Sequence, residues 1–130
     1  MRVTPKPINM KYRFVITLFI LFANTLSAQT FKEHIQSGKL AEKNGDYDVA
    51  IKEYSMAIAM DPTYSFARCM RSFCYAEKKN YHAAYADIDT AIQIHPDYGY
   101  YFSVRGRYLY ELEKYDAALK DLNKALESDS

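Results

Sequence analysis

Proline and glycine are scarce in this chain of 130 residues, which contains four of each. Beyond the first ten residues the only prolines are Pro62 and Pro96, while Ala, Tyr, Lys and Glu are frequent. Proline and glycine interrupt helices, whereas Ala, Lys and Glu favour them. The composition therefore predicts an all-α protein, and the length allows a single domain.

The sequence also lacks the motifs that mark most enzymes and metalloproteins. It contains no Gly-rich phosphate-binding loop and no GxSxG motif. Its histidines lie in different predicted helices or turns, at spacings that bring no two of them to one metal ion: His34, His82 and His95. We therefore expect a protein that is not an enzyme and that has no cofactor and no metal site.

Cysteine is limited to Cys69 and Cys74, which lie five positions apart in one predicted helix. The helical rise and the angular offset together separate their Cα atoms by more than the roughly 7 Å that a disulfide tolerates. We expect no disulfide between them and interpret both as small buried hydrophobic residues.

A large excess of positive charge is missing as well. The formal net charge is +1, and all 16 acidic residues lie beyond residue 29, where 13 basic residues oppose them for a net charge of −3. With no basic stripe to neutralise phosphates, nucleic acid is not an expected partner. The other four basic residues lie near the N-terminus: Arg2, Lys6, Lys11 and Arg13.

The first 28 residues have the order of segments found in a secretory signal peptide. Lys11 and Arg13 precede the apolar run FVITLFILFA at 14–23, and the more polar NTLSA follows. This order predicts cleavage after Ala28 and export, either to the periplasm or out of the cell, with no membrane contact beyond this segment. The run is shorter than a membrane span of about 20 residues, and an uncleaved anchor is the alternative. Met10, which opens the charged segment MKYR, is a candidate for the true start.

A repeat of 34 residues fills the rest of the chain. Some columns keep the residue identity and others keep only its type, and a period of this length indicates helical units that stack on one another. The identical columns are Ala50, Ala84 and Ala118; Ala57, Ala91 and Ala125; and Tyr47, Tyr81 and Tyr115. The similar columns are Ile51, Tyr85 and Leu119; Tyr54, Ile88 and Leu122; and Gly38, Ser72 and Gly106.

Each repeat is predicted to hold two amphipathic helices. Turns are expected at 44–46, 79–80 and 113–114, and Pro62 and Pro96 separate one repeat from the next because proline cannot continue a helix. Asp46 and Asn80 are suitable N-caps of the second helices. The small residue of each first helix is expected to meet the alanine of the second helix at close range. The apolar face of the first of these second helices consists of Ala50, Tyr54, Ala57 and Ile58.

This pattern resembles the tetratricopeptide repeat (TPR). Gly38, Ala41, Tyr47, Ala50, Tyr54, Ala57 and Pro62 carry it first; Ser72, Tyr75, Tyr81, Ala84, Ile88, Ala91 and Pro96 carry it next; Gly106, Leu109, Tyr115, Ala118, Leu122 and Ala125 carry it last. Ala41 and Leu109 replace the family's Tyr, and Ser130 stands where the family has Pro. The resemblance implies an α-solenoid of three helix-turn-helix repeats, at 31–64, 65–98 and 99–130, in a right-handed superhelical stack.

The resemblance also implies a concave groove lined by the first helices, and with it a protein or peptide partner. Aromatic anchors are typical of peptide grooves, although Phe66 and Phe73 fit a helix–helix core equally well. Carried over to this sequence, the groove residues are Lys39, Phe66, Cys69, Met70, Phe73, Tyr100, Arg107 and Tyr110, with Glu42 and Glu77 beside them. The carboxylate clamp with which some members hold chaperone C-termini is absent, because its five positions hold Ile35, Lys39, Met70, Tyr100 and Val104.

Two Arg–Asp pairs are predicted to fix the geometry of the helix pairs. In each, the acid lies sixteen positions after the base, on the second helix of the repeat. The first repeat has Ser37 in place of the Arg but keeps Glu53, so Arg71 is expected to reach back to Glu53. The pairs are Arg71 with Asp87 and Arg105 with Asp121.

The last predicted helix carries an apolar stripe of Leu119, Leu122 and Leu126. Repeats bury such stripes against their neighbours, so a second copy, a partner or a continuation of the chain is expected to cover this one. The stripe is thus a candidate assembly face of a homo-oligomer.

Taken together, these patterns predict an exported adaptor that binds a peptide or protein in its groove. Two alternatives stay open: a structural protein that self-assembles through the last helix, and an accessory subunit of an envelope enzyme or transporter complex.

Overall fold

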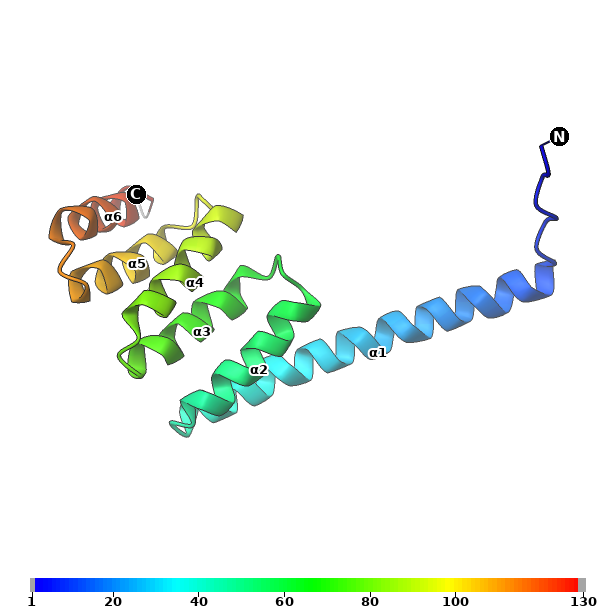
Figure 1. Cartoon of the computed structure of the whole chain (residues 1–130), viewed down its shortest axis with the longest axis horizontal. Helices are drawn as coiled ribbons and strands as arrows, with labels where there is room; N and C mark the ends of the chain where they lie inside the picture. Colours follow the sequence, from blue (N-terminus) through cyan, green and yellow to red (C-terminus); the bar gives the residue numbers. More distant parts are fainter. Residues whose placement is uncertain (1, 129–130) are drawn as a thin grey trace. The chain divides into compact units, whose positions relative to one another are not determined.

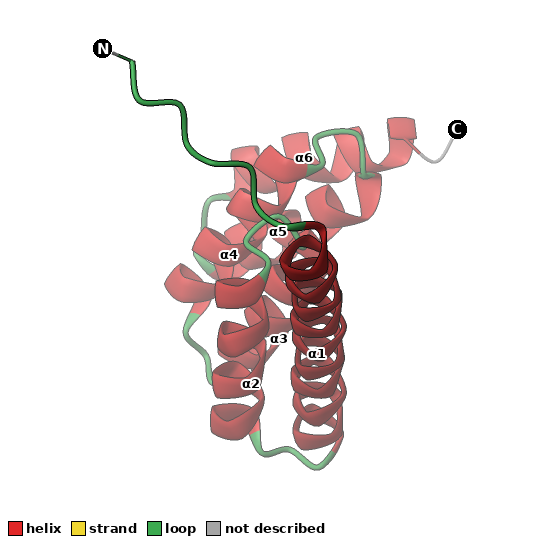
Figure 2. Cartoon of the chain, turned by 90° about the vertical axis from the view of Figure 1, so that its right-hand side faces the viewer, coloured by secondary structure: helices red, strands yellow, loops and turns green. Residues whose placement is uncertain are grey.

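A computed structural model describes residues 2–128, which form six helices and no strands (Figure 1). The prediction of an all-α fold is confirmed. Short loops join the helices, as Figure 2 shows. Ser130, which takes the proline position of the third repeat, lies outside the described residues. The helices are α1 (Met10–Lys43), α2 (Tyr47–Met60), α3 (Ser65–Glu77), α4 (Tyr81–Ile94), α5 (Gly99–Glu111) and α6 (Tyr115–Ser128).

The chain divides into two units, the first ending at Thr30 and the second beginning at Phe31. In the first unit an irregular segment, 2–9, precedes the N-terminal part of α1, whose apolar side chains are exposed. α1 contains an 18-residue window of mean hydropathy 1.6, and by length and composition it could cross a membrane. Its apolar stretch is thus longer than the run at 14–23 suggests. A signal sequence passes the same test, so the helix is compatible with the predicted signal peptide and with an anchor.

In the second unit each helix from α2 onward packs against the next one along the chain. One core cluster joins the C-terminal part of α1 to α2 and α3 around Tyr54, which is fully buried. A second cluster joins α3, α4, α5 and α6 around Ile88 and Tyr108. Cys69 belongs to the second cluster and Cys74 to the first, and both are free and fully buried, as predicted.

The same turn closes α1, α3 and α5. In each turn one residue has a positive φ angle, which is the left-handed conformation that commonly ends a helix. The residues with positive φ are Gly45 (80°), Lys79 (61°) and Glu113 (59°). The amide of the following residue donates to a carbonyl five positions back: Asp46 to Ala41, Asn80 to Tyr75, and Lys114 to Leu109, each at 2.9 Å. The turns expected at 44–46, 79–80 and 113–114 therefore share one backbone geometry.

Only one of the two predicted N-caps forms its side-chain hydrogen bond. The Asn80 side chain accepts from the amide of Ala83 at 3.2 Å. Asp46 occupies the N-cap position of α2, but its side chain makes no capping hydrogen bond. The prediction for Asp46 was wrong in this respect.

The small residues of the first helices lie against large side chains of the second helices. A Cβ atom added to Gly38 would lie 2.6 Å from the Tyr54 ring. A Cβ atom on Gly106 would lie 3.0 Å from Leu122 and 3.2 Å from the carbonyl oxygen of Ala118. The expected partner was the alanine column. The closest atoms instead belong to the column of Tyr54 and Leu122, because these longer side chains reach across the gap between the helices.

Both predicted Arg–Asp pairs are present. The guanidinium of Arg71 donates twice to Asp87, with both distances 2.6 Å, and Arg105 donates twice to Asp121, at 2.6 and 2.8 Å. Planar two-point pairing of this kind is the strong form of a charge-assisted hydrogen bond. The acids are nearly buried, with side chains 8% exposed.

Each arginine also reaches back to the preceding repeat. Arg105 Nη1 donates to Asp89 at 2.5 Å, and Arg71 Nη1 donates to the Ser55 hydroxyl at 2.8 Å. The expected contact of Arg71 with Glu53 was wrong: Glu53 pairs with His34 at 2.7 Å. Ser55 and Asp89 occupy the same column, two positions after the acid column of Glu53 and Asp87. The arginine therefore contacts the preceding repeat through this later column and not through the acid column.

The predicted stripe on α6 is exposed. Leu119, Leu122 and Leu126 are 60%, 41% and 70% exposed. The earlier members of two of these columns are buried: Tyr54 and Ile88 correspond to Leu122 and are 0% exposed, and Ile58 and Ile92 correspond to Leu126 and are 8% and 7% exposed.

Candidate functional site

A groove of about 780 Å³ runs along the first helices of the repeats. Its volume lies within the roughly 300–1,000 Å³ that is typical of ligand sites. α1, α3 and α5 supply most of its walls, as the resemblance to the TPR implied. The residues that line this concave groove are Lys39, Glu42, Lys43, Tyr47, Phe66, Met70, Phe73, Glu77, Tyr98 and Tyr100.

Phe66 and Phe73 form the aromatic part of the groove. Both are half-buried, and Phe73 also packs against the second core cluster. Phe73 therefore lines the groove and also packs against the core. Lys39 Nζ lies 5.3 Å from the centre of the Phe66 ring, and the Arg107 guanidinium lies 5.5 Å from that of Phe73. A cation therefore stands over each of the two rings.

Glu42 is held in place by a tyrosine of the core. The Tyr54 hydroxyl donates to the Glu42 carboxylate at 2.7 Å. Burial and this hydrogen bond raise the pKa of Tyr54 well above its usual value, so the hydroxyl keeps its proton and remains a donor. The carboxylate of Glu42 is thus partly satisfied from within the protein, whereas the ammonium groups of Lys39 and Lys43 extend from an exposed helix face.

Five of the eight groove residues predicted from sequence line the groove: Lys39, Phe66, Met70, Phe73 and Tyr100. Cys69 is fully buried, and burial raises the pKa of its thiol to about 12, so it offers the groove neither surface nor a thiolate. Arg107 lies over Phe73 at an adjacent hollow. Tyr110 lies outside the groove, and its ring packs edge to face on Tyr115, with centroids 5.4 Å apart. Cys69 and Tyr110 are thus not among the residues that line this groove.

Sequence reasoning missed Lys43, Tyr47 and Tyr98 as groove residues. A signal for Tyr98 was present, because Tyr64 and Tyr98 recur at the repeat spacing of 34, directly before α3 and α5. Two of the clamp positions, Ile35 and Val104, are buried in the core and cannot contact a ligand.

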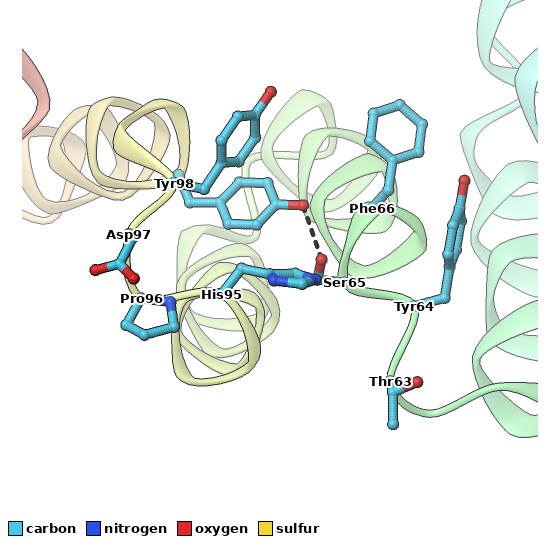
Figure 3. A pocket seen from close by; sticks show the side chains of 9 residues that line it. Thr63, Tyr64, Ser65, Phe66, His95, Pro96, Asp97 and Tyr98 are labelled. Atoms are coloured by element: carbon cyan, nitrogen blue, oxygen red, sulfur yellow. Dashed lines mark hydrogen bonds between the residues drawn. The ribbon is translucent and has the colours of Figure 1, made fainter. Parts of the chain in front are cut away.

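A second hollow, which we call the aromatic cup, lies at the loop side of α3 and α5 (Figure 3). Its volume is about 520 Å³. The Ser65 and Tyr101 hydroxyls are hydrogen-bonded to each other at 3.0 Å, and the His95 ring points toward Ser65. The cup is lined by Thr63, Tyr64, Ser65, Phe66, His95, Pro96, Asp97, Tyr98 and Tyr101.

No group of three or more His, Cys, Asp or Glu residues within 2–128 could hold a metal ion. The groups that line the groove and the cup are aromatic rings, lysine ammonium groups, carboxylates, hydroxyl groups and the His95 ring.

Comparison with known proteins supports an all-α solenoid of helix-turn-helix repeats. The tetratricopeptide repeat model matches residues 34–64 and 101–130. Tetratricopeptide repeats are thus supported by a family model as well as by the structures described next. A comparison with curated proteins finds no match.

Solved structures with this architecture include two that hold peptides. The first TPR of Spaghetti (RPAP3), bound to the HSP90 peptide SRMEEVD, is 28% identical and has a TM-score of 0.74, with 77% of this chain and 79% of that chain covered. The second TPR domain of human RPAP3, in complex with the HSP70 peptide SGPTIEEVD, is 25% identical with a TM-score of 0.74, covering 78% and 85%. The TPR2B domain of yeast Sti1 is 23% identical and has a TM-score of 0.75, with 78% of this chain and 81% of that chain covered, and it shows the shared fold.

Proposed function

We propose that this chain is a non-enzymatic adaptor that captures a peptide or protein segment in its concave groove. The observation that carries the proposal is the groove itself, about 780 Å³ in volume and lined by three successive first helices with half-buried aromatic rings. The peptide complexes of the two RPAP3 domains support a protein-interaction module.

The proposed ligand is held differently from a chaperone C-terminus. Of the five clamp positions only Lys39 carries a charge, and Ile35 and Val104 are buried. Binding energy in this groove must therefore come mainly from apolar contacts with Phe66, Met70 and Phe73, with Lys39 and Lys43 orienting acidic groups of the ligand. Aromatic anchors in such positions commonly account for most of the affinity.

A groove variant and a matched control test the proposal. A partner is first isolated from native extract, and its binding segment is synthesised as a peptide. Calorimetry then compares the unaltered chain with Phe73→Ala and with Tyr110→Ala, which removes an aromatic ring outside the groove. We expect Phe73→Ala to weaken binding about 30-fold, as for loss of about 2 kcal/mol at an anchor, and Tyr110→Ala to bind normally. Equal affinities of all three proteins, with unchanged thermal melts, would exclude the groove as the binding site.

Export is part of the same proposal. The charged opening, the exposed apolar part of α1 and the small-residue segment that ends at Ala28 support a signal peptide and a periplasmic or secreted protein. A segment of this kind is compatible with an anchor as well, and the two outcomes differ in whether the chain keeps its first 28 residues.

A second candidate function is self-assembly through α6. It is favoured by the exposure of Leu122 and Leu126, because their columns are buried at both earlier junctions of the same chain. Light scattering of the purified chain tests it. Leu122→Glu should convert an oligomer to a monomer, while Val49→Glu, at an exposed position of α2, should not. A chain that is monomeric before any substitution excludes this function.

A further inference from the structure

The aromatic cup has two ring walls that come from equivalent positions of successive repeats. Tyr64 and Phe66, at the start of α3, have ring centroids 6.2 Å apart at 68°. Tyr98 and Tyr101, at the start of α5, have centroids 4.7 Å apart at 88°. Figure 3 shows Phe66 and Tyr64 on one side of the hollow and Tyr98 on the other. Each wall thus combines a ring edge with a ring face, and ring faces carry the negative part of the quadrupole.

One charged side chain lines the cup directly, and one cation of the chain, Lys39, lies over the Phe66 ring. Asp97 is the only Asp, Glu, Lys or Arg that lines the cup, and it stands at the rim with its carboxylate directed away from the rings. Several ring faces in the described chain are occupied by the protein's own cations: Lys39 over Phe66, which is one of the rings of the cup, Arg107 over Phe73 and Lys124 over Phe102 at 4.3 Å. Among residues 2–128 no cation of the chain lies over Tyr64, Tyr98 or Tyr101. The cup therefore presents three tyrosine rings over which no cation of the described chain lies, and one carboxylate at its rim.

The cup and the concave groove are neighbours that share two lining residues. Phe66 and Tyr98 line both hollows, so they form the boundary between them. A segment bound along the groove would pass this boundary and could place one side chain in the cup.

We propose that the aromatic cup is a subsite for a basic side chain, an arginine or a lysine, of the segment bound in the groove. The source of this side chain rests on the proposed function, whereas the affinity of the cup for a cation does not. Aromatic rings attract a cation over their faces, and the effect is largest where water is partly excluded. Asp97 adds a long-range attraction, and the hydroxyl groups of Thr63 and Tyr101 offer acceptors to a guanidinium group.

The sequence preference of the ligand follows from the two hollows together. Lys39 and Lys43 line the groove beside Glu42 and Glu77, so the charges of the groove balance, while the cup favours a basic residue. The bound segment should therefore carry a basic residue at the end of an apolar stretch that contacts Phe66, Met70 and Phe73, which distinguishes it from a purely acidic peptide.

A single-residue probe tests the cup without a groove ligand. The full isotope-labelled chain is kept in a mild detergent and titrated by nuclear magnetic resonance with N-acetyl-argininamide, and in parallel with neutral N-acetyl-norleucinamide. We expect the arginine probe to shift the amide signals of Ser65, His95 and Tyr98, and the neutral probe to bind at least about 3-fold more weakly.

Variants then distinguish the contribution of the aromatic ring from that of the charge, with a control for the fold. Tyr64→Leu should weaken the arginine probe about 3- to 10-fold, Tyr64→Phe should keep its affinity, and Asp97→Asn should weaken it by a smaller factor that vanishes at high salt. Tyr110→Ala, at an exposed ring away from the cup, should change nothing.

The proposal is overturned if the neutral probe binds as well as the arginine probe, or if the arginine probe shifts other signals and is indifferent to Tyr64→Leu. Either result leaves the groove untouched, because the groove is judged by the response of the natural ligand to Phe73→Ala. If Phe73→Ala left the affinity for the natural ligand unchanged while the arginine probe still bound the cup, the groove function would be excluded and the cation affinity of the cup would remain.

Discussion

At the scale of single residues, Arg105 links two successive repeats. It donates to Asp121 of its own repeat and to Asp89 of the preceding one, and its guanidinium also lies 5.4 Å from the centre of the Phe102 ring. Asp121 is 8% exposed and Asp89 is 31% exposed, so only Asp121 would be left without hydration if Arg105 were removed.

Arg105→Met is therefore predicted to lower the free energy of unfolding by about 3 kcal/mol, because it leaves the Asp121 carboxylate buried and unpaired. The double change Arg105→Met/Asp121→Leu should cost less than the single one, since it removes the stranded charge. Urea unfolding monitored by circular dichroism measures both. If the double variant were less stable than Arg105→Met, the unpaired Asp121 carboxylate would not be the main cause of the loss of stability in the single variant.

The two thiols are predicted to be inert in the folded chain. Burial is the main cause that raises the pKa of Cys69 and of Cys74 to about 12. The thiols thus stay protonated at pH 8, and the thiolate that an alkylating reagent needs is scarce. Mass spectrometry after iodoacetamide treatment at pH 8 should find no adduct until denaturant is added, with reactivity rising only as the pH approaches the pKa. Rapid alkylation of the native protein would contradict the burial of both residues.

At the scale of elements, the three helix-ending turns differ in how well their residues fit the backbone. Gly45 adopts a positive φ angle without steric cost, whereas Lys79 and Glu113 place a Cβ in the left-handed region. Lys79→Gly and Glu113→Gly are each predicted to raise the free energy of unfolding by about 1 kcal/mol, and Gly45→Lys to lower it by a similar amount. Thermal and urea melts of the three variants test this. A loss of stability in both glycine variants would mean that the unfolded-chain entropy of glycine outweighs the relief of strain.

Much of this element structure follows from the 34-residue columns, because helix pairs, turns and the Arg–Asp pairs depend on spacing that every repeat shares. The groove is harder to predict. Neighbouring helical positions differ by about 100° around the axis, so Cys69 lies in the core while Met70 lines the groove. The pairing of Arg71 with Ser55 rather than Glu53 has the same origin. The repeat columns predict reliably which helix a residue occupies. They predict less reliably whether its side chain points into the core or into the groove.

At the scale of the whole molecule, the chain combines a repeat unit with an N-terminal unit of opposite character. Beyond residue 29 the net charge is −3, while the residues before it carry only basic charges and an exposed apolar helix. A groove that orients its ligand with Lys39 and Lys43, and a cup that favours a basic residue, would act in whichever compartment the first unit directs the repeats to. The fate of that unit therefore decides which partners are available.

Cleavage after Ala28 is the prediction that tests this fate. A signal peptidase requires a small residue at the cleavage site, so the exported chain should begin at Gln29 and be found outside the cytoplasm. Ala28→Leu should leave the precursor uncut and membrane-associated, whereas Ala59→Leu, at an exposed alanine of α2, should be processed normally. Mass spectrometry of the intact protein after cell fractionation measures both the mass and the location. A full-length chain that stays in the membrane would establish the anchor instead, because the apolar window of α1 is long enough to span it. In that case the groove and the cup would act next to the membrane surface, and their partners would be sought among proteins held at that surface.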